Sequence, residues 1–67
     1  MFDKEKFSLA LENSGLKKRF VAKQIGIAYG NFLKKCNGAV MWKVDEALNV
    51  SKVLRMSSEE RDSIFFA

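Results

Sequence analysis

Glycine interrupts the first half of this chain so often that only short helices fit between the interruptions. Gly15, Gly26 and Gly38 lie eleven and twelve residues apart, and the chain contains no proline. Between them, apolar residues recur at intervals of three and four, the period of a helix, and no segment shows sustained strand-like alternation. Glycine readily adopts the left-handed conformation that ends many helices. The pattern therefore predicts an all-α fold.

Five helices are predicted once the residues that can begin a helix are considered. Asp3 can cap the first helix, with Phe2 and Phe7 at the two positions of a hydrophobic staple. Ser57 and Glu60 have the spacing of a capping box before the last helix. The chain has no linker and no low-complexity segment. We therefore expect a single domain, residues 1–67, with helices over residues 4–14, 18–25, 29–36, 44–54 and 58–65.

Apolar side chains at helical spacing also predict parts of the core. Cys36 falls on the apolar side of its helix, where we expect it to be a small buried hydrophobe. Trp42 is expected to fill the space between the third and fourth helices. The fourth helix is expected to bury one stripe, formed by Val44, Ala47, Leu48, Ser51 and Leu54.

The composition argues against an enzyme. The chain has no histidine, which excludes the catalytic systems and metal sites that need an imidazole. Its single cysteine permits neither an internal disulfide nor a zinc ribbon, which is typical of a reducing compartment. Apolar runs never exceed four residues, too few for a membrane span or a signal peptide. We expect a soluble cytoplasmic protein without cofactor, metal or small-molecule substrate.

Positive charge is concentrated in the middle of the chain. Residues 15–44 contain seven Lys and Arg and no Asp or Glu, whereas the segments before and after carry a small excess of acid. If these side chains converge in the fold, they form a surface that attracts a polyanion. The alternative is an ordinary solvated face. Concentration in one contiguous segment favours binding.

Residues 18–36 have the spacing of two short helices joined by a tight turn. Two helices that cross steeply need a small residue where their backbones approach, and Ala22 stands at that point. The turn needs a residue that tolerates positive φ, which is Gly26. Phe32 is the apolar side chain that pins the second helix. This arrangement predicts a helix-turn-helix whose second helix projects outward.

Further residues extend the pattern over residues 5–66, namely Leu16, Ile25, Ile27, Asn37-Gly38, Trp42–Ala47, Leu54 and Ile64–Phe66. The whole set resembles the phage Cro and repressor type helix-turn-helix proteins, also called the xenobiotic-response-element superfamily. The resemblance implies a compact five-helix, lambda-repressor-like DNA-binding domain with the helix-turn-helix at about 18–36. Its third helix would lie in the major groove of double-stranded DNA.

The resemblance also implies which side chains contact DNA. The positions that would contact base edges are Tyr29, Gly30, Asn31 and Lys34. The positions that would contact phosphates are Lys17, Lys18, Arg19, Lys35, Asn37 and Lys43. An asparagine can bond adenine at two points, and a lysine can reach the acceptors of guanine.

The sequence favours a small repressor of the Cro type. One recognition helix reads only half a site, so we expect a homodimer that binds an operator. Phe65 and Phe66 are the expected dimer contacts, although adjacent helical residues point about 100° apart, so that one of them can fill the core. We expect a phage or prophage gene product in the bacterial cytoplasm.

The alternative is a protein-binding modulator or antirepressor that uses the same fold to engage another phage repressor. Three features favour it: a glycine within the recognition helix at Gly30, the exposed C-terminal aromatic residues, and Lys17 and Ala28 where the family has helix caps.

Overall fold

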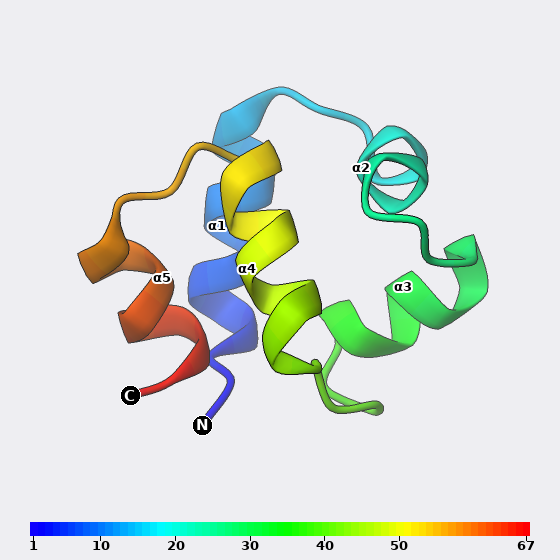
Figure 1. Ribbon diagram of the computed structural model, residues 1–67. Coiled ribbons are helices and arrows are strands. Elements are labelled where there is room, and N and C mark those ends of the chain that lie inside the picture. The colour runs from blue at the N-terminus through cyan, green and yellow to red at the C-terminus, as the bar shows by residue number, and fades with distance from the viewer.

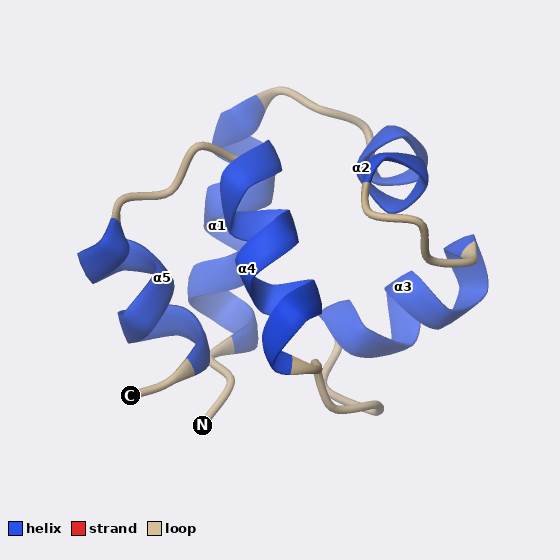
Figure 2. Cartoon of the chain, viewed as in Figure 1, coloured by secondary structure: helices blue, strands red, loops and turns tan.

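The computed structural model describes residues 1–67 and consists of five helices without a strand (Figure 2). The helices are α1 (Lys4–Ser14), α2 (Lys18–Gln24), α3 (Tyr29–Cys36), α4 (Val44–Val53) and α5 (Ser58–Phe65). The all-α, five-helix prediction is confirmed, and the bounds of α1, α3 and α5 agree with it. Helices α2 and α4 each end one residue earlier than predicted, because Ile25 and Leu54 are their C-caps.

Helix α5 and the two chain ends lie on one side of the molecule, and the α2–α3 pair lies on the other (Figure 1). The Met1 amino group donates a hydrogen bond to the Ala67 carbonyl oxygen at 2.9 Å, and the Asp3 amide donates to the Ile64 carbonyl at 2.7 Å. These bonds join the start of α1 to the end of α5. None of the helices has the length and apolar character needed to cross a membrane.

The predicted helix starts are confirmed in part. The Asp3 side chain accepts a hydrogen bond from the Lys6 amide at 3.0 Å, and the Phe2 and Phe7 rings lie 5.6 Å apart, as a hydrophobic staple requires. The Ser57 hydroxyl oxygen accepts from the Glu60 amide at 3.1 Å, which forms one half of the expected capping box. The N-termini of α2 and α3 have no side-chain cap.

The core is a single cluster of nine buried apolar residues contributed by all five helices: Phe7, Leu11, Val21, Ala22, Phe32, Ala47, Val50, Ile64 and Phe65. Trp42 packs beside this cluster, with its ring centroid 5.3 Å from that of Phe7, 6.1 Å from that of Phe32 and 5.4 Å from that of Phe65. Trp42 therefore links α3 to α1 and α5, whereas the prediction placed it between the third and fourth helices.

Two expectations about the core are wrong. Val44 is 64% exposed and Leu48 lies at the surface, whereas Val50, which the predicted stripe omits, is fully buried. The buried face of α4 is centred on Ala47, Val50 and Ser51, because these are the positions turned toward the core cluster. Cys36 is half-buried rather than fully buried.

The expectation that Lys35 contacts phosphate is also wrong. Its side chain is only 3% exposed. The Lys35 ammonium forms an ion pair with Glu46 Oε1 at 2.9 Å and donates to the Met41 carbonyl at 3.0 Å. The Trp42 indole N–H in turn donates to the Lys35 carbonyl at 3.0 Å. Lys35 therefore holds the end of α3 against the loop that leads to α4, and its charge is used inside the protein.

Three helix ends share one hydrogen-bond pattern, in which an amide donates to a carbonyl five residues earlier. The donors are Ile27, Ala39 and Met56, and the residues before them, Gly26, Gly38 and Arg55, have φ values of 72°, 84° and 56°. This is the Schellman arrangement, which needs a left-handed residue at that point. Arg55 is the only residue other than glycine with a positive φ.

We predict that Glu46→Gln lowers the free energy of unfolding by about 3 kcal/mol, because it leaves the Lys35 ammonium buried without a countercharge. Urea denaturation followed by circular dichroism measures this loss. The double variant Lys35→Met, Glu46→Gln is the control and should be more stable than Glu46→Gln alone, since no unpaired charge remains. A double variant that is less stable than the single one would contradict this role of the pair.

The same pair makes stability depend on pH. Burial raises the pKa of the Glu46 carboxyl, but hydrogen bonds from the Lys35 ammonium and the Lys43 amide outweigh it, so the pKa lies below its usual value. A lowered pKa stabilises the folded state above the unfolded value of about 4.3, and this contribution disappears as the pH falls through the folded value. The stability difference between the wild type and Glu46→Gln should therefore shrink below about pH 4.

Candidate nucleic-acid interface

Helices α2 and α3 are joined by a turn over residues 25–28. Figure 1 shows α2 along its axis while α3 runs across the view, so the two helices cross steeply. Ala22 and Phe32 are buried and Gly26 has a φ of 72°, as expected for a small contact residue, an apolar pin and a turn glycine. The packing of this pair therefore leaves one side of α3 facing away from the core.

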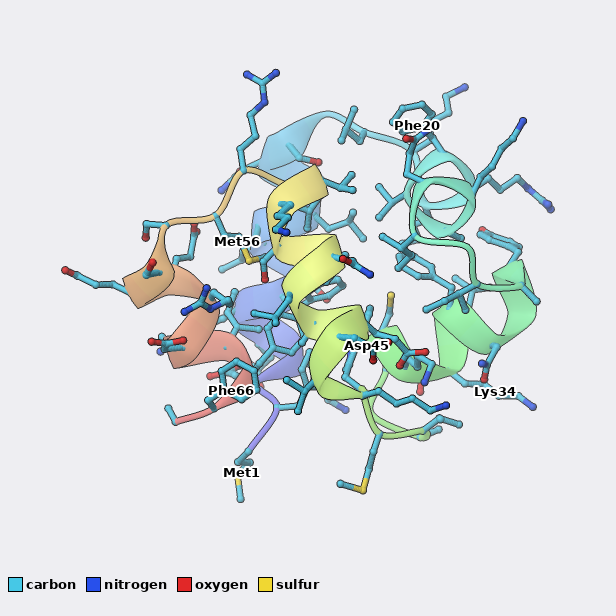
Figure 3. The ribbon with its side chains drawn as sticks, viewed as in Figure 1. Met1, Phe20, Lys34, Asp45, Met56 and Phe66 are labelled. Carbon is cyan, nitrogen blue, oxygen red and sulfur yellow. The ribbon has the colours of Figure 1, made fainter.

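The outward side of α3 carries three of the four residues expected to contact bases. Gly30, Asn31 and Lys34 are exposed, whereas Phe32 and Lys35 point inward. The Lys34 side chain projects away from the body of the molecule (Figure 3). A Cβ atom at Gly30 would meet nothing within 4 Å, so the fold itself does not require a glycine there. The outward side of α3 therefore offers the amide of Asn31, the ammonium group of Lys34 and, at Gly30, backbone without a side chain.

Tyr29 is placed differently from the other three expected base contacts. It is half-buried, and the guanidinium carbon of Arg19 lies 4.1 Å from the centre of its ring. This cation–π contact covers a face of the ring and positions Arg19 beside the start of α3. The Tyr29 hydroxyl forms no hydrogen bond within the chain, so it can still donate and accept one.

The fold brings Lys18 and Asn37 together from the start of α2 and the end of α3. Both line a hollow of about 350 Å³, which Lys4 and Glu5 of α1 also border. The Asn37 side-chain oxygen accepts a hydrogen bond from the Ala39 amide at 2.9 Å, which leaves its NH₂ group as a donor. Sequence reasoning missed Lys4, because it lies in a segment with a net negative charge and only the tertiary fold places it beside Lys18.

The remaining expected phosphate contacts, Lys17 and Lys43, are exposed at the starts of α2 and α4. Neither they nor Lys18, Arg19, Lys23 and Lys34 take part in an ion pair, since the chain contains only two, Lys35–Glu46 and Arg61–Asp62. Six of the seven central cations are thus exposed and unpaired, and Lys35 is the exception.

The expected dimer contacts separate into one core residue and one surface residue. Phe65 belongs to the core cluster, so its assignment to an interface is wrong, whereas Phe66 is 47% exposed. Phe66 borders an entirely apolar hollow of about 390 Å³ together with Met1 and Met41, which is 87% exposed. We call Met1, Met41 and Phe66 the Phe66 surface; Met1 and Phe66 are labelled in Figure 3. The two methionines were missed because no helical periodicity marks a chain end or a loop.

Cys36 lies beside the Lys18 hollow, and its surroundings make it a weak nucleophile. Burial raises the pKa of the thiol to about 11, although the nearby Lys18 charge lowers it. The thiolate is the reactive form, so only about one molecule in ten thousand is reactive at pH 7. The site therefore has no activated thiol.

We predict that Cys36 reacts with iodoacetamide at pH 8 more than about 100-fold more slowly than a cysteine in a short peptide, because its thiolate fraction is smaller by that factor. Mass spectrometry of timed samples measures the rate. The same protein unfolded in urea serves as the control and should react at the peptide's rate. Equal rates in the folded and unfolded protein would contradict the burial of this thiol.

Comparison of the chain with known proteins finds no relative. No model of a protein family matches the chain, and neither a curated protein nor a solved structure is significantly similar to it.

Proposed function

We propose that this chain is a sequence-specific DNA-binding transcriptional regulator, a repressor of the Cro type that binds an operator with α3 in the major groove. The observation that carries this proposal is the outward face of α3, where Gly30, Asn31 and Lys34 are exposed. The unpaired cations of α2 and Lys43, which precedes α4, belong to the same basic segment, residues 15–44, which contains no acidic residue. Such a surface attracts the phosphates of a duplex while the helix offers groups to the bases.

Each part of this surface has a distinct task in the proposal. Asn31 offers an amide that can bond adenine at two points, and Lys34 offers donors for guanine. Lys18, Asn37 and Lys4 contact a phosphate from their shared hollow, and Arg19, held against Tyr29, contacts another. Phosphate contacts set the orientation of the protein on the duplex, whereas base contacts select the sequence.

The size of the domain is compatible with the proposed homodimer. The Cα trace measures 26 × 23 × 20 Å, and equivalent half-sites on DNA lie roughly 34 Å apart. Two copies in contact, with their side chains included, match that spacing. The Phe66 surface is apolar and includes Met41 from the loop that follows α3, so it provides a contact near the recognition helix.

We place the protein in the cytoplasm of a bacterial host, encoded by a phage or prophage.

A second candidate function is that of a modulator that engages another repressor. It is favoured by the small number of base-reading groups, since Gly30 has no side chain and Arg19 covers a face of the Tyr29 ring. This candidate predicts DNA binding that depends strongly on salt but not on sequence. Selection of duplexes from a random library at about 150 mM salt separates the two, because only the repressor recovers a two-fold symmetric motif.

We predict that Asn31→Ala weakens binding to the selected site by about 1–3 kcal/mol and relaxes the preference at one base pair. Lys18→Ala should weaken binding to all sequences alike and lower the slope of log affinity against log salt by about one unit. Fluorescence anisotropy with cognate and scrambled duplexes measures both effects. Lys6→Ala removes a cation that bonds Ser63 on the α5 side and should change neither. Equal losses on both duplexes for the two variants would refute these roles.

We predict that Gly30→Ala makes the protein more stable and its DNA complex weaker. The free energy of unfolding should rise, by less than the roughly 0.8–1.0 kcal/mol of a helix interior because Gly30 is the second residue of α3, since alanine favours a helix and the added methyl group meets nothing. Affinity for the selected duplex should fall, because the methyl group stands between the backbone and the base edges. Unfolding and anisotropy measurements on one preparation test both effects. Unchanged affinity would remove Gly30 from the interface.

We predict that Phe66→Asp converts the dimer to a monomer, because it places a charge in an apolar contact. Sedimentation equilibrium measures the mass, and binding to a two-half-site duplex should weaken more than binding to a single half-site. Leu9→Asp is the matched control, since Leu9 is an exposed apolar residue of α1 outside the Phe66 surface. A Phe66→Asp protein that remains dimeric would show that the interface lies elsewhere.

A further inference from the structure

A further cleft lies between α2 and the C-terminal end of α4. Its volume is about 630 Å³. Four apolar side chains and two cations line most of it: Leu16, Phe20, Val53, Leu54, Lys52 and Arg55. Phe20 is 46% exposed although it is a large aromatic residue, and neither cation forms an ion pair. No acidic residue lines the cleft.

This cleft opens on a different side of α2 from the proposed DNA surface. Side chains two positions apart on a helix point about 200° apart, so Phe20 and Lys18 lie on nearly opposite sides of α2. Lys18 faces Leu33 and Asn37 of the α3 region, whereas Phe20 faces Lys52–Arg55. Figure 3 likewise shows Phe20 at the top of the molecule, far from Lys34. A duplex on α3 therefore leaves the cleft open.

The backbone at Arg55 supports a use for its side chain. Glycine occupies each of the other three left-handed positions, Gly15, Gly26 and Gly38. At the end of α4 the same hydrogen-bond pattern is formed with arginine, even though a left-handed conformation is unfavourable for a residue with a Cβ atom. An arginine therefore stands at the edge of the cleft at the expense of backbone strain, which a glycine would avoid.

We propose that this cleft is the docking site for an acidic protein segment that carries an apolar side chain. The apolar side chain would pack on Phe20 between Leu16 and Val53, and carboxylates beside it would pair with Lys52 and Arg55. Guanidinium groups form two parallel hydrogen bonds with a carboxylate, so Arg55 gives the contact direction as well as charge. The inference does not depend on DNA binding, because it uses none of the residues assigned to the α3 surface.

The test is selection of binders from a phage-displayed library of random dodecapeptides on the full-length wild type. We expect enrichment of peptides in which Asp or Glu flanks Leu, Phe or Trp. For a synthetic peptide from this pool, Arg55→Gly should reduce the affinity at least tenfold in calorimetry while raising the melting temperature, because glycine relieves the left-handed strain. Phe20→Ser should reduce the affinity similarly, and Lys6→Ala should leave it unchanged.

The result that overturns the proposal is a selection that enriches no acidic peptides, or peptides that bind wild type and Arg55→Gly equally. A third measurement separates a protein segment from nucleic acid. If Arg55→Gly lowers the affinity for a random duplex or a single strand as much as Lys18→Ala does, the cleft belongs to the nucleic-acid surface and the proposal fails. Failure to recover a DNA motif would refute the proposed repressor but leave this cleft unaffected.

Discussion

The buried ammonium group of Lys35 is the contact on which the presentation of α3 depends. It pairs with Glu46, donates to the Met41 carbonyl, and its own backbone carbonyl accepts from Trp42. Charge in an interior is tolerated only when it is paired and hydrogen-bonded, so the loop from 37 to 43 closes where Glu46 and the Met41 carbonyl reach the Lys35 ammonium. That closure sets Trp42 against Phe7, Phe32 and Phe65, and thereby joins the end of α3 to the core. The outward face of α3 follows from the same contact, because Lys35 points inward and Asn31 and Lys34 point away.

Three surfaces of different chemistry result from this packing. The basic surface around α3 suits a polyanion, and the Phe66 surface is apolar. The cleft between α2 and α4, which Phe20 lines, combines apolar and cationic groups. Their separation lets one small domain, as proposed, bind an operator, pair with a second copy and engage an acidic segment at the same time. The proposed DNA surface and the proposed peptide cleft lie on opposite sides of α2, so neither ligand blocks the other.

Much of the helical framework was predictable, because helix ends are decided by neighbouring residues. Asp3, Gly15 and Gly26 act through hydrogen bonds and φ angles within a few positions of themselves, and the helices they bound were placed correctly to within a residue. The buried face of α4 was not predictable in the same way. Val44 and Leu48 are as apolar as the residues that are buried, and only packing against the other helices brings Val50 inside and leaves those two at the surface.

The sequence by itself determined the helix count, the turn between α2 and α3, and the concentration of positive charge in one segment. These properties depend on local backbone chemistry and on composition. Only the tertiary structure decided which of those charges are free. Lys35 has the same side chain as Lys34 beside it, yet one meets Glu46 inside the fold and the other meets solvent. Tertiary packing likewise places Lys4 and Lys18 at the same hollow. It also buries Phe65 in the core while its neighbour Phe66 stays at the surface. Whether a side chain is available depends on the side chains that the fold packs around it, and those come from distant parts of the chain.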